Sequence, residues 1–415
     1  MPLEPEPVST GAPRAPWLSI VGIGAEGERG LSEAARGCIL RAELVFGGAR
    51  QLRLVEGWVG GRAQPWPTPF AEGVAQVLAR RGAPTCVLAS GDPFFYGVGA
   101  TLAPHLARGE FECHPVPSSV SLAAARLGWP LQDTEVVSLH GRDLHDIIRH
   151  LAPGRRLLAL SWGRDTPAEL AELLVARGFG PSRLVVLEAL GGPEERLRET
   201  RARSLALDTV QDLNVVALEL SAEPQAFVLP CRASLPDGAF ESDGQLTKRD
   251  VRAVTLSALA PRAGERLWDI GAGSGSVGIE WMLAHPACRA IAIERDAARC
   301  ARIASNARRL GVPALEVVHA AAPDALDGLP PPDAVFVGGG ASEPGLLEAA
   351  RRALPPGGRL VANAVALESQ ALLLEAYRQH GGELCRLAFE SAAPLGGMTC
   401  FRPALAVLQW RFVRS

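Results

Sequence analysis

The fold is predicted most directly by Leu267-Trp-Asp-Ile-Gly-Ala-Gly-Ser-Gly-Ser-Val-Gly278. In this stretch an apolar strand pattern leads into Gly271, Ala272, Gly273, Ser274 and Gly275, and helical spacing follows. Glycine permits positive φ angles and lets a ligand approach the backbone closely. The N-terminus of the following helix offers N–H groups that no helical carbonyl accepts. Because many nucleotide-binding folds use such a loop, the loop alone leaves the ligand open.

Two acidic residues narrow the choice of ligand. Glu294 ends the next predicted strand, where a carboxylate can accept the hydroxyl groups of an adenosine ribose, as it does in NAD-dependent enzymes. Asp269 stands before the first glycine, where a carboxylate suits a cationic amino-acid tail better than a pyrophosphate. The combination favours S-adenosylmethionine (SAM) over NAD. Glycines that serve only a tight turn are the structural alternative.

Around this loop, strands and helices alternate, which predicts a Rossmann-like α/β domain with a mostly parallel sheet. Thr247 is predicted to cap the first helix, with Asp250 in the position of a capping-box acid. Two late strand patterns lack a helix between them and predict an antiparallel end to the sheet. The predicted strands are Arg266–Ile270, Ala290–Ile293, Leu315–Val318, Ala334–Val337, Arg359–Ala362, Gly382–Glu390 and Leu405–Arg411.

The first half of the chain also alternates strand and helix patterns, which predicts a second α/β domain with a largely parallel sheet. The stretch 223–244 is rich in proline and glycine and lacks helical periodicity, so we place a domain boundary there. The predicted organisation is a disordered leader over 1–16, one domain over 17–225, a linker over 226–240 and a second domain over 241–415.

Composition excludes several classes of function. The 42 Lys+Arg and 45 Asp+Glu residues give a net charge of −3, which argues against a nucleic-acid partner. No apolar stretch is long enough to span a membrane, and no signal peptide is recognisable, so we expect a cytoplasmic protein. The 8 cysteines form no CxxC pair and no Cys/His group has zinc spacing, so no metal is expected.

Further motifs make the second half resemble the decarboxylating precorrin methyltransferase domain of cobalamin biosynthesis. They are Leu235-Pro-Asp-Gly-Ala-Phe-Glu241, Leu246–Arg252, His319–Leu326, Asp333–Gly339 and Val361–Glu368. The resemblance runs from about residue 235 to the C-terminus. It implies that Thr247, the loop Gly271–Gly275, Glu294 and Ala322 line a SAM pocket.

The first half resembles the tetrapyrrole methylase family, the two-lobed class III methyltransferases. The motifs that carry this resemblance are Val21–Gly24, Ser90-Gly-Asp-Pro-Phe-Phe-Tyr-Gly97, Val116–Ser119 and Asn214–Leu218. The family holds SAM between two α/β lobes, and the resemblance implies contacts at Gly91, Asp92, Ser118 and Ser119. Read alone, Ser90–Pro93 is equally a plain turn, since Asp and Pro favour turns.

The order of the two halves resembles the bifunctional decarboxylating C5,15-methyltransferases. This resemblance implies a tetrapyrrole substrate, one SAM site in each domain, methylation of a precorrin at C5 and C15, and decarboxylation of the ring C acetate chain. Arg249, Arg252 and Arg402 are candidates for binding substrate carboxylates, and we expect a homo-oligomer. The alternatives are a SAM-dependent methylase of RNA and a non-catalytic protein that binds SAM or a tetrapyrrole. The sequence identifies no catalytic acid–base residue.

Overall fold

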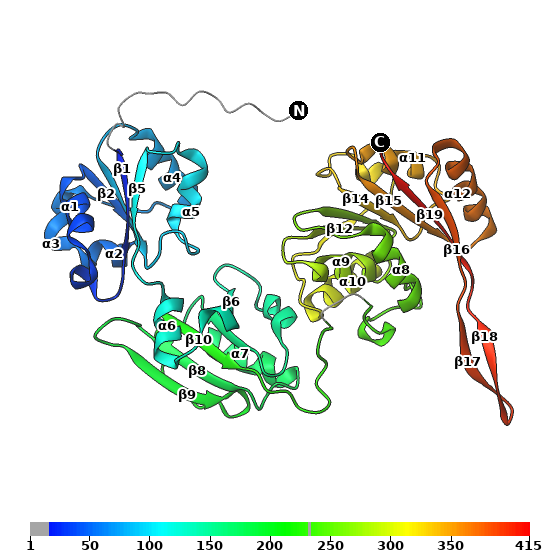
Figure 1. Ribbon diagram of the computed structural model, residues 1–415, viewed down its shortest axis with the longest axis horizontal. Coiled ribbons are helices and arrows are strands. Elements are labelled where there is room, and N and C mark those ends of the chain that lie inside the picture. Colours follow the sequence, from blue (N-terminus) through cyan, green and yellow to red (C-terminus); the bar gives the residue numbers. More distant parts are fainter. Residues whose placement is uncertain (1–15, 231–233) are drawn as a thin grey trace. The chain divides into compact units, whose positions relative to one another are not determined.

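Residues 16–230 and 234–415 are described by the computed structural model, whose contacts divide the chain into two units (Figure 1). Unit 1 comprises the described residues up to Gly141 together with Ala152–Ala226. Unit 2 comprises Arg142–Leu151 and Phe227–Ser415. The predicted leader lies outside the described residues except for Pro16, as do 231–233 of the predicted linker, and the domain limits stay a prediction.

The first sheet of unit 1 is wholly parallel, in the order β3-β2-β4-β1-β5. Parallel strands that are buried on both faces read as continuous apolar runs, and such runs mark β1, β2 and β4 in the sequence. Strands β3 and β5 are not buried, and the sequence did not predict them. The strands are β1 (Leu18–Ile23), β2 (Leu44–Gly47), β3 (Ala63–Pro65), β4 (Thr85–Ser90) and β5 (Phe111–His114). The helices of this lobe are α1 (Glu33–Arg41), α2 (Ala49–Leu54), α3 (Glu56–Val59), α4 (Phe70–Ala79) and α5 (Val98–Leu102).

The second sheet of unit 1 is mixed, in the order β6-β7-β10-β8-β9, and only β6 and β7 pair in parallel. A largely parallel sheet was therefore the wrong prediction for this lobe. Strands β8 and β9 are joined without a helix, and such a short connection forces antiparallel pairing. The elements are β6 (Thr134–Ser138), β7 (Arg156–Leu160), β8 (Arg183–Glu188), β9 (Arg196–Arg201), β10 (Asn214–Glu219), α6 (Ser119–Leu127) and α7 (Thr166–Ala176).

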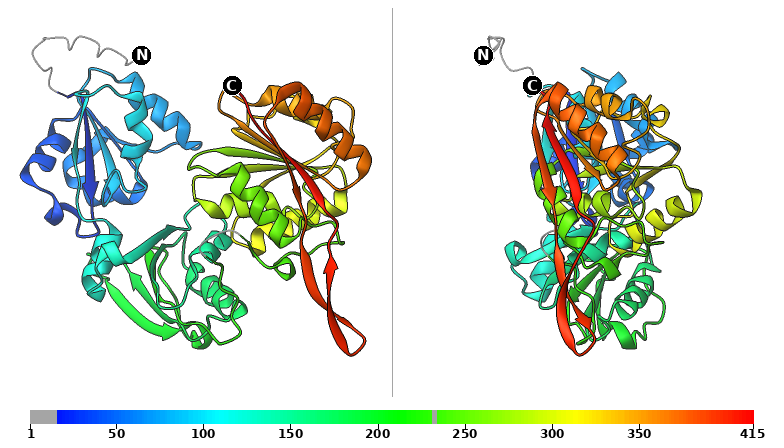
Figure 2. Two further views of the ribbon diagram at one scale, coloured as in Figure 1. Left: turned by 45° about the vertical axis from the view of Figure 1, so that its right-hand side comes forward. Right: turned by 90° about the vertical axis from the view of Figure 1, so that its right-hand side faces the viewer.

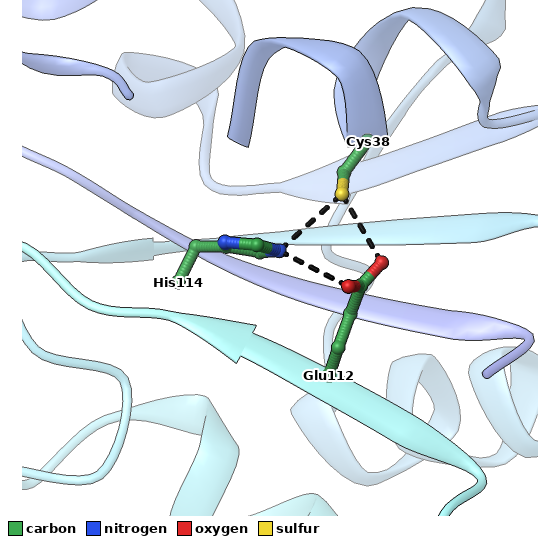
Figure 3. Close-up of side chains that lie close together, drawn as sticks. All are labelled: Cys38, Glu112 and His114. Atoms are coloured by element: carbon green, nitrogen blue, oxygen red, sulfur yellow. Dashed lines mark hydrogen bonds and ion pairs between the residues drawn. The ribbon is translucent and has the colours of Figure 1, made fainter. Parts of the chain in front are cut away.

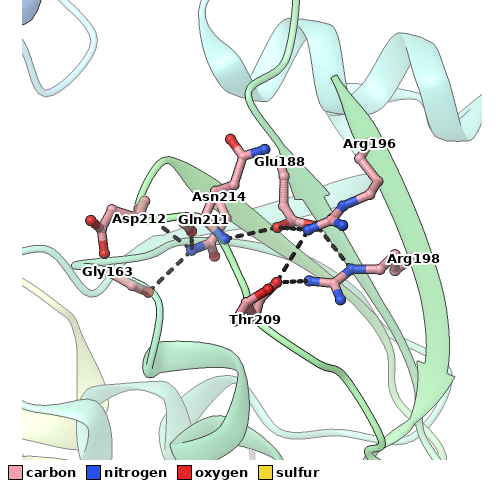
Figure 4. Close-up of polar contacts among 8 residues, drawn as sticks. All are labelled: Gly163, Glu188, Arg196, Arg198, Thr209, Gln211, Asp212 and Asn214. Carbon is pink, nitrogen blue, oxygen red and sulfur yellow. Dashed lines mark hydrogen bonds and ion pairs between the residues drawn. The ribbon is translucent and has the colours of Figure 1, made fainter. Parts of the chain in front are cut away.

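A buried carboxylate ties the edge strand β9 to this sheet (Figure 4). Glu188 is fully buried, and its oxygens accept hydrogen bonds from Arg196, Arg198 and the backbone N–H of Gln211 at 2.8–3.0 Å. Burial alone would raise the pKa of Glu188, but these hydrogen bonds hold it below its ordinary value. The charged run at 194–203, which reads in sequence as a solvated face, therefore contributes partners to a buried acid.

We expect Arg198→Ala to lower the free energy of unfolding by about 1–3 kcal/mol, because it removes a charged donor from a buried acceptor. Arg201→Ala, on the exposed part of the same strand, is the control and should change it by less than about 0.5 kcal/mol. Urea denaturation measures both. Because the native pKa of Glu188 is lowered, the difference should shrink as pH falls through the acidic range and Glu188 becomes protonated. Equal losses in the two variants would contradict this.

Unit 2 is built on one seven-stranded sheet in the order β13-β12-β11-β14-β15-β19-β16. The first five strands in this order are parallel, and β19 runs antiparallel to both of its neighbours. The antiparallel end predicted from the two late strand patterns is confirmed. The strands are β11 (Arg266–Ile270), β12 (Arg289–Glu294), β13 (Glu316–His319), β14 (Ala334–Val337), β15 (Arg359–Ala364), β16 (Glu383–Leu387) and β19 (Val407–Val413).

Helices cover both faces of this sheet, each over its own apolar core. One face packs against α8 (Arg249–Leu259), α9 (Ser276–Ala284) and α10 (Ala297–Arg309). The other packs against α11 (Leu346–Ala353) and α12 (Leu367–His380). The predicted cap of the first helix is wrong, since Lys248 occupies the N-cap position and contributes no side-chain hydrogen bond.

A hairpin that the sequence did not predict lies between β16 and β19. Its strands are β17 (Glu390–Leu395) and β18 (Met398–Pro403), and Figure 2 shows that it projects from the rest of unit 2. Most residues of this hairpin are exposed, so its strands show no clear apolar alternation in the sequence. Across the described part of the chain, no helix has the length and apolar character needed to cross a membrane.

Candidate functional site

The glycine loop of unit 2 lies at the carboxyl end of β11, where the strand order of the sheet reverses between β11 and β14. Open α/β sheets bind ligands at this point. Gly271 has φ +66°, and a Cβ there would lie 2.7 Å from the carbonyl oxygen of Gly339, in the turn after β14. The loops that follow the two central strands therefore touch, and only glycine permits that approach.

Asp269 is buried beneath the loop. One carboxylate oxygen accepts the backbone N–H of Gly278 at 2.8 Å, which anchors the first turn of α9. The other oxygen, Oδ1, has no hydrogen-bond partner among the described residues. Burial raises the pKa of Asp269 to about 7, against the lowering effect of the Gly278 hydrogen bond, and the charge of Glu294 raises it further. An unpaired, buried acceptor in this position suits a cationic group.

The raised pKa makes the stability of unit 2 depend on pH. Between about pH 4 and 7 the folded state holds a proton on Asp269 that the unfolded chain releases, so stability falls as pH rises through this window. Asp269→Asn should remove up to about 1.4 kcal/mol per pH unit of this dependence. Denaturation of the segment 233–415 at several pH values measures it. A pH slope in Asp269→Asn equal to that of the parent contradicts the assignment.

Glu294 ends β12 directly beside the glycine loop, as its position in the sequence predicts. It is 4% exposed, and its two oxygens accept the backbone N–H groups of Gly273 at 2.9 Å and Asp296 at 3.1 Å. Each carboxylate oxygen can accept a second hydrogen bond. Glu294 thus holds the loop in place and keeps acceptor capacity for hydroxyl groups.

The other predicted site residues of unit 2 lie either in the glycine loop or in segments that are hydrogen-bonded near it. Ser274 is buried, and its hydroxyl donates to the carbonyl oxygen of Gln245 at 2.9 Å, which brings the segment before α8 over the loop. Thr247 lies in that same segment and is half-buried. Ala322 is half-buried, two residues after Ala320, whose N–H donates to the carbonyl oxygen of Glu294. Ala272 and Gly275 lie within the loop itself, and Gly275, with φ +75°, is the N-cap residue of α9.

In unit 1 the structure brings together the two turns that the sequence singled out. Gly91 follows β4 with φ +62°, and a Cβ there would lie 3.1 Å from Cα of Ser118. Asp92 accepts the N–H of Phe94 at 2.8 Å, which is a local turn contact. Ser118 caps α6 by accepting the N–H of Ser121, and Ser119 is the first residue of that helix.

The close approach extends to the first strand of unit 1. A Cβ at Gly22 would lie 2.1 Å from the carbonyl oxygen of Gly91 and 3.0 Å from the backbone nitrogen of Val116. Three backbone turns therefore meet at the carboxyl ends of β1, β4 and β5. The close contacts of these segments are made by backbone atoms, and the role of Gly91, Asp92, Ser118 and Ser119 in SAM binding stays a prediction.

The structure shows that the prediction for one of the three candidate arginines is wrong. Arg252 is fully buried, and its Nε lies 2.7 Å from the carboxylate of Glu280, which is also buried. Arg252 therefore belongs to the core of unit 2 and cannot reach a substrate. Arg249 is exposed at the first position of α8, and Arg402 is exposed on β18.

The sequence analysis assigned Arg252 to substrate binding and did not identify Glu280, because a helical arginine is ordinarily expected at the surface. The buried acid Glu280 also accepts the N–H groups of Ser234 and Leu235. It thereby anchors the segment at Ser234 and Leu235, which precedes α8 in the chain. No pattern along the chain links these residues.

Two family models match the chain, one in each half. Residues 18–206 match the family model of tetrapyrrole (corrin/porphyrin) methylases, and residues 238–414 match that of the precorrin methyltransferase domain. A Sinorhizobium protein named precorrin-6Y C(5,15)-methyltransferase [decarboxylating] is 53% identical over 401 residues, which cover 97% of this chain and 97% of that protein.

Two relatives from Salmonella typhimurium match less than half of the chain. One, named cobalt-precorrin-7 C(5)-methyltransferase, is 33% identical over 43% of this chain and 88% of its own length. The other, named cobalt-precorrin-6B C(15)-methyltransferase (decarboxylating), is 36% identical over 38% of this chain and 83% of its own length. Each of these two relatives is thus named for one methylation, at C5 or at C15.

Proposed function

The chain belongs to the precorrin-6Y C(5,15)-methyltransferase (decarboxylating) family, and from this membership we propose how its two units divide the reaction. The chain is a SAM-dependent methyltransferase of cobalamin biosynthesis that methylates a precorrin at C5 and C15 with decarboxylation. Unit 1 methylates C5. Unit 2 methylates C15 and removes the carboxyl group of the ring C acetate chain, so each unit has its own SAM site.

The observation that carries this proposal is the presence of two unrelated glycine turns, each at the carboxyl ends of parallel strands in its own unit. Two different architectures argue against one site that serves both carbons. The two Salmonella relatives, with one named methylation each, support the same division.

The residues of unit 2 fit SAM by their chemistry. The unpaired Oδ1 of Asp269 suits the cationic amino-acid end of the molecule, and Glu294 suits the ribose hydroxyls. Gly271, Gly273 and Gly275 leave the backbone open to close approach. In unit 1, the backbone around Gly91 and the turn at Ser118 and Ser119 would hold the second molecule.

SAM supplies an electrophilic methyl group on a sulfonium. The meso carbons of a reduced tetrapyrrole are enamine-like nucleophiles, so the residues of the chain have to align carbon, methyl and sulfur and keep water out. A strong base is not required for that step. The electrons left by the departing CO2 can enter the conjugated macrocycle, and a proton from solvent then converts the remaining methylene to a methyl group, so the task of unit 2 is to orient the acetate chain.

The experiment that tests this function is a mass spectrum of the product formed by the full chain from SAM and precorrin-6B. The expected product has gained two methyl groups and lost one CO2. Parallel incubation of labelled SAM with RNA separates the RNA methylase, which would label the RNA. A protein that binds SAM or the tetrapyrrole without turnover would return the substrate unchanged, and either result would refute the proposal.

A further inference from the structure

Three side chains with metal-binding atoms meet beside the first sheet of unit 1 (Figure 3). Cys38 lies on α1, and Glu112 and His114 lie on β5. The Sγ atom of Cys38 is 3.1 Å from Oε1 of Glu112 and 3.4 Å from Nε2 of His114, and Nε2 is 3.3 Å from Oε2 of Glu112. Among the described residues, this is the one group of Cys, His, Asp and Glu side chains close enough to hold a metal ion.

These separations approach those of a tetrahedral zinc site. Zn–S bonds of about 2.3 Å and Zn–N or Zn–O bonds of about 2.0–2.2 Å at tetrahedral angles place neighbouring ligand atoms roughly 3.3–3.6 Å apart. The short distances from Glu112 run to different oxygens, Oε1 toward Cys38 and Oε2 toward His114, and all the ligand atoms lie within 4.8 Å of one another, so rotation of the Glu112 carboxylate would bring one oxygen to the shared ion. Thiolate and imidazole together favour zinc over magnesium or calcium, which prefer oxygen ligands. We propose that Cys38, Glu112 and His114 bind one Zn²⁺ ion, with water as the fourth ligand.

The surrounding structure positions the ligands. Glu112 and His114 are two residues apart on β5, so both face the same side of the sheet, toward α1. Ser19, the register partner of Glu112 on β1, donates its hydroxyl to Oε1 of Glu112 at 2.9 Å. Such a second hydrogen bond typically orients a metal-binding carboxylate. Cys38 is buried, whereas the side chains of Glu112 and His114 are partly exposed, which leaves a path from solvent.

Metal binding here exchanges a proton and transfers no electron. Burial raises the pKa of the Cys38 thiol, so in the metal-free chain this thiol is protonated at neutral pH. Zn²⁺ takes the sulfur lone pair as the S–H bond breaks, and the proton leaves to solvent. The guanidinium of Arg41, 3.6 Å from Sγ, favours the thiolate that results.

The ion would have a structural role, separate from methyl transfer. β5 is the edge strand of its sheet and pairs with β1 alone. A metal bridge to α1 would fasten that edge directly before the chain enters the turn at Ser118. The sequence did not reveal this site because Cys38 is separated from Glu112 and His114 by more than 70 residues, and no recognised metal-binding motif has this spacing.

The test uses the full chain, stripped with a chelator and titrated with Co²⁺ alone. One equivalent should produce the thiolate-to-cobalt charge-transfer band and the visible bands of tetrahedral cobalt, and Zn²⁺ should displace it. Cys38→Ala should abolish the charge-transfer band. His114→Gln should weaken Co²⁺ binding at least about 100-fold, which is the upper limit for loss of a residue that only supports a metal ligand. The side chain of His114 is partly exposed, so the fold should tolerate this change.

Cys113→Ala is the matched control. Cys113 lies between the two ligands on β5 but packs against the core on the opposite face of the sheet. Its removal should leave both bands and the affinity unchanged. The absence of tetrahedral bands in the parent overturns the proposal. So do a charge-transfer band that persists in Cys38→Ala, a Co²⁺ affinity in His114→Gln equal to that of the parent, or bands that disappear in Cys113→Ala.

Discussion

The full chain carrying Gly91→Leu is expected to stop at a product that has lost CO2 and gained a single methyl group. A side chain at Gly91 starts with its Cβ 3.1 Å from Cα of Ser118 and 3.3 Å from the carbonyl oxygen of Pro117. It would therefore separate the two turns that we assign to SAM binding in unit 1. Unit 2, which we propose methylates C15 and removes CO2, would be untouched.

The measurement is a mass spectrum of the product, with Gly128→Leu as the matched control. Gly128 has φ +67°, close to the +62° of Gly91, but a Cβ there meets nothing within 4 Å. Both variants carry the same backbone strain of about 1–2 kcal/mol, and only Gly91→Leu obstructs the site. Asp92→Ala, which removes the acceptor for the Phe94 N–H, should stall at the same species.

The segment 233–415 alone should reach that same singly methylated, decarboxylated product. Addition of both methyl groups by this segment would refute the division of labour, and so would retention of the carboxyl group. The overall reaction would stand in either case, because it is read from the full chain.

Glu294→Ala is expected to weaken SAM binding to the segment 233–415 at least tenfold. Charge-assisted hydrogen bonds to two ribose hydroxyls contribute about 1.5–3 kcal/mol each, before non-additivity. The variant also frees the N–H groups of Gly273 and Asp296, so the loop itself loosens. Calorimetric titration with SAM measures the affinity, and a cooperative unfolding transition checks the fold.

Glu294→Gln separates the two contributions. The amide oxygen can still accept the N–H of Gly273 and hold the loop, but the charge and one acceptor are gone. Its affinity for SAM should lie between those of the parent and Glu294→Ala. Affinity equal to the parent in Glu294→Ala would exclude Glu294 from the SAM site.

The sequence was sufficient wherever the relevant signal lies within one short stretch. The turn at Gly271–Gly275 depends on glycines that accept positive φ, and such residues are visible directly. The position of Glu294 follows from strand length, because the end of β12 must come level with the end of its parallel neighbour β11. Apolar runs marked the buried parallel strands of both units, because a strand that is buried on both faces carries apolar residues along its length.

Tertiary structure decided every property that depends on pairing across the chain. Arg252 and Glu280 look like surface charges in sequence, and only the packing of α8 on α9 buries them together. The antiparallel pairing of β10 with β7 and β8 depends on strand order, which local periodicity does not encode. Cys38, Glu112 and His114 meet because α1 packs on β1, the strand that pairs with β5. Such contacts arise from the burial of apolar surface by distant segments, and the residues they bring together share no pattern along the chain.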